Sequence, residues 1–208
     1  MCSACRLALV FAVVSNGQQR QPEYTFGTTV VSTTSFEGAI YNLPEGTEWL
    51  PKLNPKKSVG KIYTTALNVT PRPFESGFPG VTSRFEWFAI DYNARVWIEA
   101  EGRYHFRLLS DDGAIFSVNG KTLIDNDGHH PPESRTGSAE LTRGVHKFRV
   151  TYFQGPRTLV ALVLDVAMPG SNDYALFDTN KFLPPADPAK WIDGKIRAVK
   201  KYERPFGR

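Results

Sequence analysis

The sequence predicts an all-β fold, an antiparallel β-sandwich or barrel, and three observations support this prediction. Short segments with alternating apolar and polar residues recur along the chain, and no helical pattern separates them. Glycine (17 residues) and proline (15 residues) are frequent, which indicates many turns. The pair Asn119-Gly120 separates two of the segments, and this pair between two strand-like runs is a strong signal of a hairpin.

The strand-like segments follow one another with short breaks between them. Residues 24–36 are rich in Thr and Val, which favour strands. Residues 102–110 alternate, with Tyr104, Phe106 and Leu108 on one face, and residues 158–166 form a nearly continuous apolar run, typical of a strand buried on both faces. In chain order, strands are expected at residues 24–36, 61–69, 84–92, 94–100 (after a turn at Asn93), 102–110, 114–120, 121–125, 144–155 and 158–166.

Three stretches are expected to be loops, and the end of the chain is expected to differ from the rest. Residues 40–60 are turn-rich, residues 70–81 hold three prolines and two glycines, and residues 126–138 follow the hairpin. A linker and a basic tail are expected over residues 169–208. Residues 189–203 predict a short helix there, with Asp187 as its cap and Pro188 in its first turn, and with Ile192, Ile196 and Val199 on one face.

The first residues resemble an export signal. Arg6 precedes the apolar run Leu7–Val14, and small and polar residues follow. The sequence therefore predicts a signal peptide over residues 1–21, a folded domain over 22–168, and a secreted or extracytoplasmic protein of the periplasm or cell surface. A buried first strand is the alternative interpretation of the apolar run, which is too short to span a bilayer.

Charge and cysteine content exclude several classes of protein. The net charge is +4, but residues 189–208 carry seven Lys/Arg and two Asp/Glu, which leaves 18 basic and 19 acidic residues elsewhere. A body without excess positive charge lacks the electrostatic signature of nucleic-acid binding, whereas the basic tail suits a protein partner. The two cysteines, Cys2 and Cys5, exclude a disulfide scaffold and a cysteine-ligated zinc site in the body.

A family resemblance rests on three segments that stand in order between Trp87 and Val166. They are FEWFAIDYNARVWIEAEGRYHFRLLSDDGAIFSVNGKTLIDNDG, then GHHPPESRTGSAEL, then RGVHKFRVTYFQGPRTLVALVLDV. The SDDG turn, the Asn-Gly hairpin, the Gly-x-His strand start and the YF-containing strand together resemble the PA-fourteen (PA14) domain, named after anthrax protective antigen. A weaker extension reaches back to Phe36, and the flanks 1–22 and 170–208 lie outside it.

The resemblance implies a β-sandwich that often binds carbohydrate. In the adhesin branch of the family, two adjacent aspartates joined by a cis peptide hold a calcium ion, and that ion takes sugar hydroxyls as ligands. The matching pair here is Asp111 and Asp112. Other members, including the toxin domain, have no known sugar site, so a non-catalytic protein-interaction or structural module is the alternative function.

The residues themselves agree with calcium as a candidate cofactor. Two successive carboxylates repel each other, and a nearby cation relieves that repulsion. Because the hairpin reverses at Asn119-Gly120, its open ends at Asp112 and Asn126 are expected to be neighbours. We therefore expect Asp111, Asp112 and Asn126 as metal ligands. The expected carbohydrate-binding residues are these three with Asp127 and His129. A polar turn without a metal is the competing interpretation.

The other candidates are weaker. Adjacent His129 and His130 suggest a transition-metal site, but neighbours in an extended segment point opposite ways, so a sugar contact by His129 is preferred. Sugar sites use exposed aromatic rings, for which the loop residues Phe74, Phe78 and Phe153 are the candidates. The sequence holds no Gly-x-Ser-x-Gly, no phosphate-binding glycine loop and no His-Glu-x-x-His. No catalytic residue is therefore expected, and the chain is not expected to be an enzyme.

Overall fold

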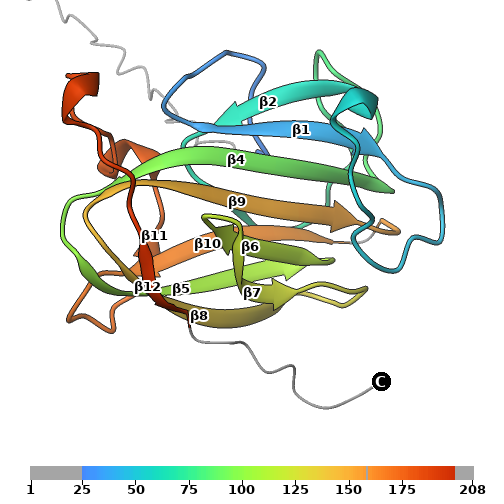
Figure 1. Cartoon of the computed structure of the whole chain (residues 1–208). Helices are drawn as coiled ribbons and strands as arrows, with labels where there is room; N and C mark the ends of the chain where they lie inside the picture. Colours follow the sequence, from blue (N-terminus) through green and yellow to red (C-terminus); the bar gives the residue numbers. More distant parts are fainter. Residues whose placement is uncertain (1–24, 158, 200–208) are drawn as a thin grey trace, which may run out of the picture.

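The structure is a computed structural model that describes residues 25–157 and 159–199. Two antiparallel sheets pack face to face, as Figure 1 shows. The expected signal peptide at residues 1–21 and the basic end at residues 200–208 lie outside the described residues. The predicted all-β antiparallel sandwich is confirmed.

The first sheet has six strands in the order β2-β1-β4-β9-β6-β7. Each neighbouring pair is antiparallel. Its strands are β1 (Phe36–Asn42), β2 (Gly60–Thr64), β4 (Phe88–Ile98), β6 (Ala114–Val118), β7 (Lys121–Asn126) and β9 (Gly144–Gln154). The hairpin β6–β7 turns at Asn119 and Gly120, both of which have positive φ, as this type of two-residue turn requires.

The second sheet has the order β11-β10-β5-β8-β12, with β3 also paired to β10. Its strands are β3 (Asn68–Arg72), β5 (Gly102–Asp111), β8 (Glu133–Leu141), β10 (Val160–Ala167), β11 (Ala175–Leu176) and β12 (Ile196–Val199). Three single 3-10 turns complete the described chain: η1 (Pro55–Lys57), η2 (Thr179–Lys181) and η3 (Pro188–Lys190).

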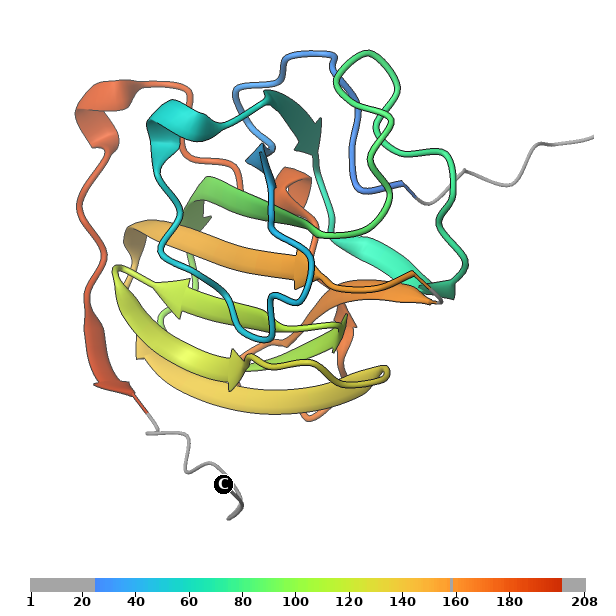
Figure 2. The ribbon, with the colours of Figure 1, turned by 90° about the vertical axis from the view of Figure 1, so that its right-hand side faces the viewer.

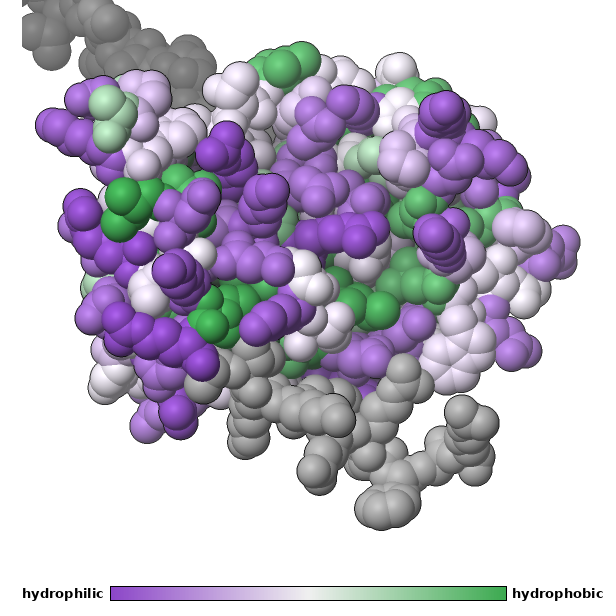
Figure 3. Space-filling model, viewed as in Figure 1, coloured by the Kyte–Doolittle hydropathy of each residue, from purple (hydrophilic) through white to green (hydrophobic). Residues whose placement is uncertain are grey.

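The core lies between the two sheets and is rich in aromatic rings. Tyr104, Phe106 and Leu108, the predicted inner face of β5, are at most 1% exposed. The ring of Phe106 lies 5.0 Å from that of Phe116 and 5.7 Å from that of Phe148, both edge to face. The outer face of the first sheet is mostly polar, with small separate apolar areas (Figure 3).

Three of the strand expectations are wrong. β4 runs through Asn93 without a turn, because Asn93 sits at an outward, exposed position that continues the alternation and pairs with Arg149 of β9. Residues 61–69 do not form one strand, since β2 belongs to the first sheet and β3 to the second. Between residues 25 and 35 the only ladder contact is the bridge from Thr28 to Tyr63, so the expected strand 24–36 reduces to its last residue, where β1 begins.

The loop expected at residues 126–138 is much shorter, because β8 occupies Glu133–Leu141. The segment is rich in Ser, Thr, Arg and Gly, which favours a loop locally. Pairing with β5 over nine residues, from Gly102–Leu141 to Ser110–Glu133, overrides this preference. Gly137 lets β8 approach β7, since a Cβ there would lie 2.5 Å from the carbonyl oxygen of Leu123. Only residues 127–132 connect β7 to β8.

The helix expected at residues 189–203 is a single turn. Asp187 caps it by accepting a hydrogen bond from the Ala189 amide, and Pro188 follows, as predicted. The chain then extends, and β12 pairs with the edge of β8 instead of continuing a helix. Gly194 and the β-branched residues that follow disfavour the helix, and the open edge of β8 provides a strand partner. Figure 2 shows this last segment (orange to red) running down one side of the sandwich.

Within residues 25–157 and 159–199, no helix has the length and apolar character needed to cross a bilayer.

Candidate functional site

The structure brings Asp111, Asp112 and Asn126 together at one end of the sandwich. Asp111 ends β5, and Asn126 ends β7 opposite Ala114, the first residue of β6. The Asn126 side-chain amide Nδ2 donates a hydrogen bond to Ser110 Oγ at 2.8 Å. The three side chains are nearly inaccessible, with 6%, 3% and 0% of each residue exposed. The neighbourhood expected from the hairpin is confirmed, and the roles of these residues as ligands stay a prediction.

Asp112 is held by the two loops that flank it. Its Oδ2 accepts a hydrogen bond from the Gly155 amide at 2.7 Å, and its Oδ1 accepts one from the His130 amide at 3.3 Å. The ring Nε2 of His129 also lies 3.3 Å from Oδ1. The peptide bond between Asp111 and Asp112 is cis. The carboxylate is therefore fixed in position by backbone groups.

A cavity of about 300 Å³ opens at the two aspartates. It is lined by Asp111, Asp112, His129, His130, Pro131, Pro132, Pro156 and Leu159. Pro156 and Leu159 come from the connection between β9 and β10, which was not expected at the site. Its signal was the Gly155-Pro156 pair, a turn that directly follows a long strand.

Burial disfavours the charged form of both carboxylates. It raises the pKa of Asp111 to about 6, helped by the negative charge of Asp112 and opposed by the two histidines and a hydrogen bond from Gln154. Burial also raises the pKa of Asp112, opposed chiefly by the hydrogen bond from Gly155 and the charge of His129. A cation between the carboxylates would compensate the charge that the protein leaves unbalanced.

The side-chain oxygen of Asn126 is a buried acceptor that no described group satisfies. Its Nδ2 donates to Ser110 and to the backbone oxygen of Glu133 at 3.0 Å, which fixes the amide. Its Oδ1 is buried and has no hydrogen-bond partner. A buried acceptor without a partner costs about 1–3 kcal/mol. Two carboxylates and an amide oxygen are hard donors of the kind calcium prefers, so this set fits calcium.

The two adjacent histidines occupy different positions at the site. Among the described residues, no group of three His, Cys, Asp or Glu side chains is arranged to hold a metal ion. The ring of His130 faces the backbone oxygens of Asn126 (3.0 Å) and Pro131 (2.8 Å), so it braces the loop. His129 keeps about half of its side chain exposed at the rim of the cavity, where it can contact a ligand.

Asp127 acts as a connector between two loops. Its Oδ1 accepts hydrogen bonds from the Leu50 amide at 3.0 Å and from the Gly128 amide at 2.9 Å. Asp127 thus joins the loop between β7 and β8 to the loop between β1 and β2. Its expected contact with sugar stays a prediction, while its visible contacts position the backbone.

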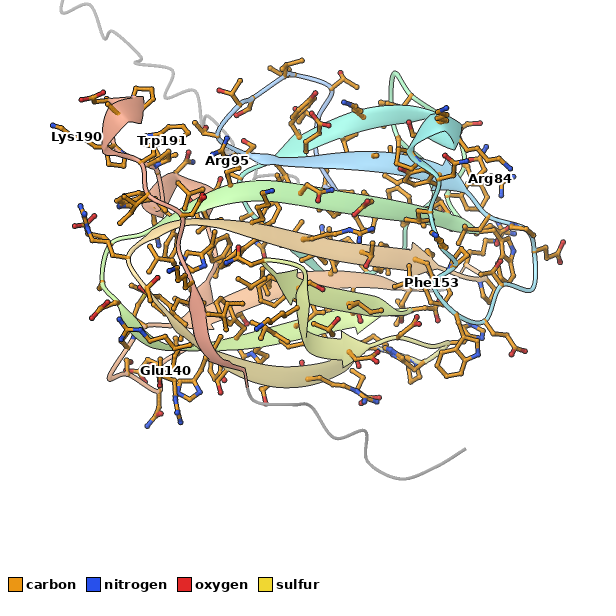
Figure 4. The ribbon with its side chains drawn as sticks, viewed as in Figure 1. Arg84, Arg95, Glu140, Phe153, Lys190 and Trp191 are labelled. Carbon is orange, nitrogen blue, oxygen red and sulfur yellow. The ribbon has the colours of Figure 1, made fainter. Side chains whose placement is uncertain are left out.

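The aromatic side chain exposed near the site is not one of the three expected from the sequence. Phe153 and Phe78 are 0% and 4% exposed, and Phe74 packs on the core, so these three cannot serve as open platforms. Figure 4 shows Phe153 at the site end of the sandwich. Trp49, in the loop between β1 and β2, is 54% exposed and lies against Gly128. Its signal was a tryptophan inside a turn-rich stretch between two expected strands.

Comparisons with known proteins agree with this architecture. Residues 76–177 match the family model of the PA14 domain. No curated protein matches the sequence. Among solved structures, the PA14 domain of the MpAFP antifreeze protein is similar, with a TM-score of 0.59 and 16% identity over 71% of this chain and 88% of that one.

Two further structures carry sugar-binding descriptions. The PA14 sugar-binding domain of an RTX adhesin has a TM-score of 0.56 and 19% identity, covering 72% of this chain and 97% of its own. The A domain of epithelial adhesin 9 from Candida glabrata, in complex with Galβ1-4GlcNAc, has a TM-score of 0.52 and 12% identity, covering 72% and 88%. At these identities the likeness shows the fold.

Proposed function

This chain carries a PA14 domain at residues 76–177, and from that premise we propose that it is a non-catalytic, calcium-dependent glycan-binding module. The observation that carries the proposal is the buried Asn126 Oδ1, which has no hydrogen-bond partner and lies at the same end of the fold as two buried carboxylates. Uncharged polar groups are rarely left this way unless something else binds them.

Asp111, Asp112 and Asn126 would hold the ion. Calcium accepts 6–8 oxygen ligands, more than these three side chains supply, so positions stay open for hydroxyl groups of a sugar. The cavity beside the aspartates is open to solvent and flanked by His129, whose ring nitrogen can donate or accept a hydrogen bond with a bound sugar. The Gly155 amide holds the Asp112 carboxylate in its orientation through a hydrogen bond to Oδ2.

The comparisons support carbohydrate as the ligand class. The RTX adhesin domain is described as sugar-binding, and the epithelial adhesin domain is in complex with a galactose-containing disaccharide. Catalytic chemistry on a glycosidic bond needs two carboxyl groups about 5–10 Å apart with distinct roles. Here the only carboxylates that line the described cavity are those of the adjacent residues Asp111 and Asp112, so binding is the better supported function.

A glycan array tests the proposal. Fluorescently labelled protein is applied with calcium, with a chelator, and as the Asp112→Asn variant. We expect signals for wild-type protein with calcium, and background signals in the other two conditions. Glycan binding that persists in the chelator would contradict the proposed dependence on calcium. The absence of any signal with calcium would favour the alternative, a protein-interaction or structural module without a sugar site.

A further inference from the structure

We infer that Trp49 forms a second sugar subsite beside the aspartate pair, so that the ligand is an oligosaccharide of at least two pyranose rings. The inference rests on the proposed function, because the first ring is the one held at Asp111 and Asp112. It adds the length of the ligand and a residue that selects for it.

Trp49 packs on the loop that carries His129, which contacts Asp112. A Cβ on Gly128 would lie 3.0 Å from the Trp49 ring, so the indole packs directly on that glycine. A Cβ on Gly113, the residue after Asp112, would lie 2.8 Å from the Gly128 amide nitrogen. His129, the residue after Gly128, reaches Asp112 itself. The backbones of Gly128 and Gly113 therefore link the indole to the aspartate pair.

The exposure of this ring is unusual for the protein. Trp49 is 54% exposed, whereas Trp97 is 4% exposed and Trp87 and Trp191 are partly buried. The rest of the loop is anchored, since Leu50 and Leu53 pack on a small apolar cluster that includes Tyr41 and Phe153. Leu50 and Leu53 are thus partly buried, whereas the indole of Trp49 stays in solvent.

The backbone beside the ring is held by a hydrogen bond to the neighbouring loop. The Leu50 amide, one residue after Trp49, donates a hydrogen bond to Asp127 Oδ1 at 3.0 Å. Asp127 belongs to the same loop as His129, so the indole and the rim of the cavity are tied together. A platform that is already fixed loses little conformational entropy on binding, which favours affinity.

The chemistry of the two positions is complementary. The aspartate pair and its ion select hydroxyl groups, while a flat indole selects the C–H face of a pyranose ring. A single sugar at the aspartates leaves Trp49 unused, and a linked second sugar covers it. We therefore expect affinity to rise with chain length from one ring to two, and then to change little.

The test compares ligands of different length on two tryptophan variants. A glycan array carrying each sugar as mono-, di- and trisaccharide is probed, with calcium present, by wild-type protein, Trp49→Ala and Trp49→Phe. Trp191→Ala is the control, because Trp191 lies at the opposite end of the sandwich from Phe153 (Figure 4). Thermal melting of each variant shows that the fold is intact.

We expect Trp49→Ala to lower di- and trisaccharide binding roughly tenfold, to the level of the monosaccharide, with monosaccharide binding unchanged. Trp49→Phe should retain most of the binding, and Trp191→Ala all of it. Equal binding of wild-type and Trp49→Ala to every length, or an equal loss at every length, would overturn the inference while leaving calcium-dependent binding intact. If wild-type protein binds no glycan at all, the proposed function itself is wrong. That result differs from the loss of the Trp49 subsite alone, in which calcium-dependent binding persists.

Discussion

The carboxylate of Asp112 accepts a hydrogen bond from the backbone amide of Gly155 at 2.7 Å. These residues are 43 positions apart in the chain, and the contact joins the end of β5 to the connection after β9. It holds one proposed calcium ligand by the backbone of the connection that follows β9, so the site depends on the packing of both sheets.

The Asp112→Asn substitution separates charge from geometry. An asparagine oxygen can still accept the Gly155 hydrogen bond, so we expect the fold to be retained and the calcium response to be lost. For wild-type protein, calcium at a hundredfold excess over its dissociation constant should stabilise the fold by about 2.7 kcal/mol. Thermal melting with calcium and with a chelator measures this. An equal calcium-induced shift in both proteins would contradict the assignment of Asp112.

The raised pKa of Asp111 predicts an unusual pH dependence. Its pKa is about 6 in the folded chain against an ordinary 3.8, so the folded state binds this proton more tightly than the unfolded state. Without calcium, this group makes the protein more stable as pH falls from about 6 toward 4, by up to about 3 kcal/mol, and the gain is absent above pH 7.

Asp111→Asn is the matched variant for that measurement, because it is neutral at every pH. Denaturant unfolding of both proteins between pH 4 and pH 7.5 in a chelator gives the difference in their free energies of unfolding. We expect the free energy of unfolding of wild-type protein to rise relative to that of the variant as pH falls. A difference that is independent of pH would show that Asp111 has an ordinary pKa.

Much of the fold was predictable because several strands and turns are specified by local residue patterns. The alternation in β5 and the Asn119-Gly120 turn identify their elements without outside information, and the hairpin then places Asp112 beside Asn126. β8 was not predictable in this way. Its residues favour a loop, and only the partner strand β5 makes them extended.

The site was predictable to the same extent. Neighbouring aspartates in a turn are visible in the sequence. Their burial, and the lack of a hydrogen-bond partner for Asn126 Oδ1, are properties of the packed molecule. Trp49 is 62 positions before Asp111, and the loop that carries it reaches the site through the Asp127 hydrogen bond. No local pattern contains that contact.

The last described segment packs on the sandwich where Gly194 contacts His146. This contact predicts the effect of Gly194→Ala. A Cβ on Gly194 would overlap the His146 ring, which is buried and hydrogen-bonded to the Thr142 carbonyl oxygen at 2.9 Å. We expect the alanine to destabilise the protein by about 1–3 kcal/mol through overpacking. Denaturant unfolding measures this cost.

A double-mutant cycle identifies the cause of that loss. Replacing His146 with alanine opens the space that the new methyl group needs, so Gly194→Ala should cost less in the His146→Ala background. An unchanged cost would place the conflict elsewhere, and no cost in either background would show that residues 192–195 do not pack on the sandwich.

Export remains a prediction from Arg6 and the apolar run Leu7–Val14. We expect protein recovered from the natural source to begin near residues 18–22, because a signal peptidase would remove what precedes them. N-terminal sequencing of that material reads the first residue directly. A mature protein that retains Met1 inside the cell would contradict the prediction of a secreted module.

The most direct test of the central claim is a calorimetric titration of calcium into chelator-treated, desalted protein near pH 7.5. We expect one binding site per chain in wild-type protein, and no heat of binding in Asn126→Ala, whose lost oxygen has no other partner in the described structure. A flat titration with well-folded wild-type protein would contradict the account, and so would an unchanged single site in Asn126→Ala.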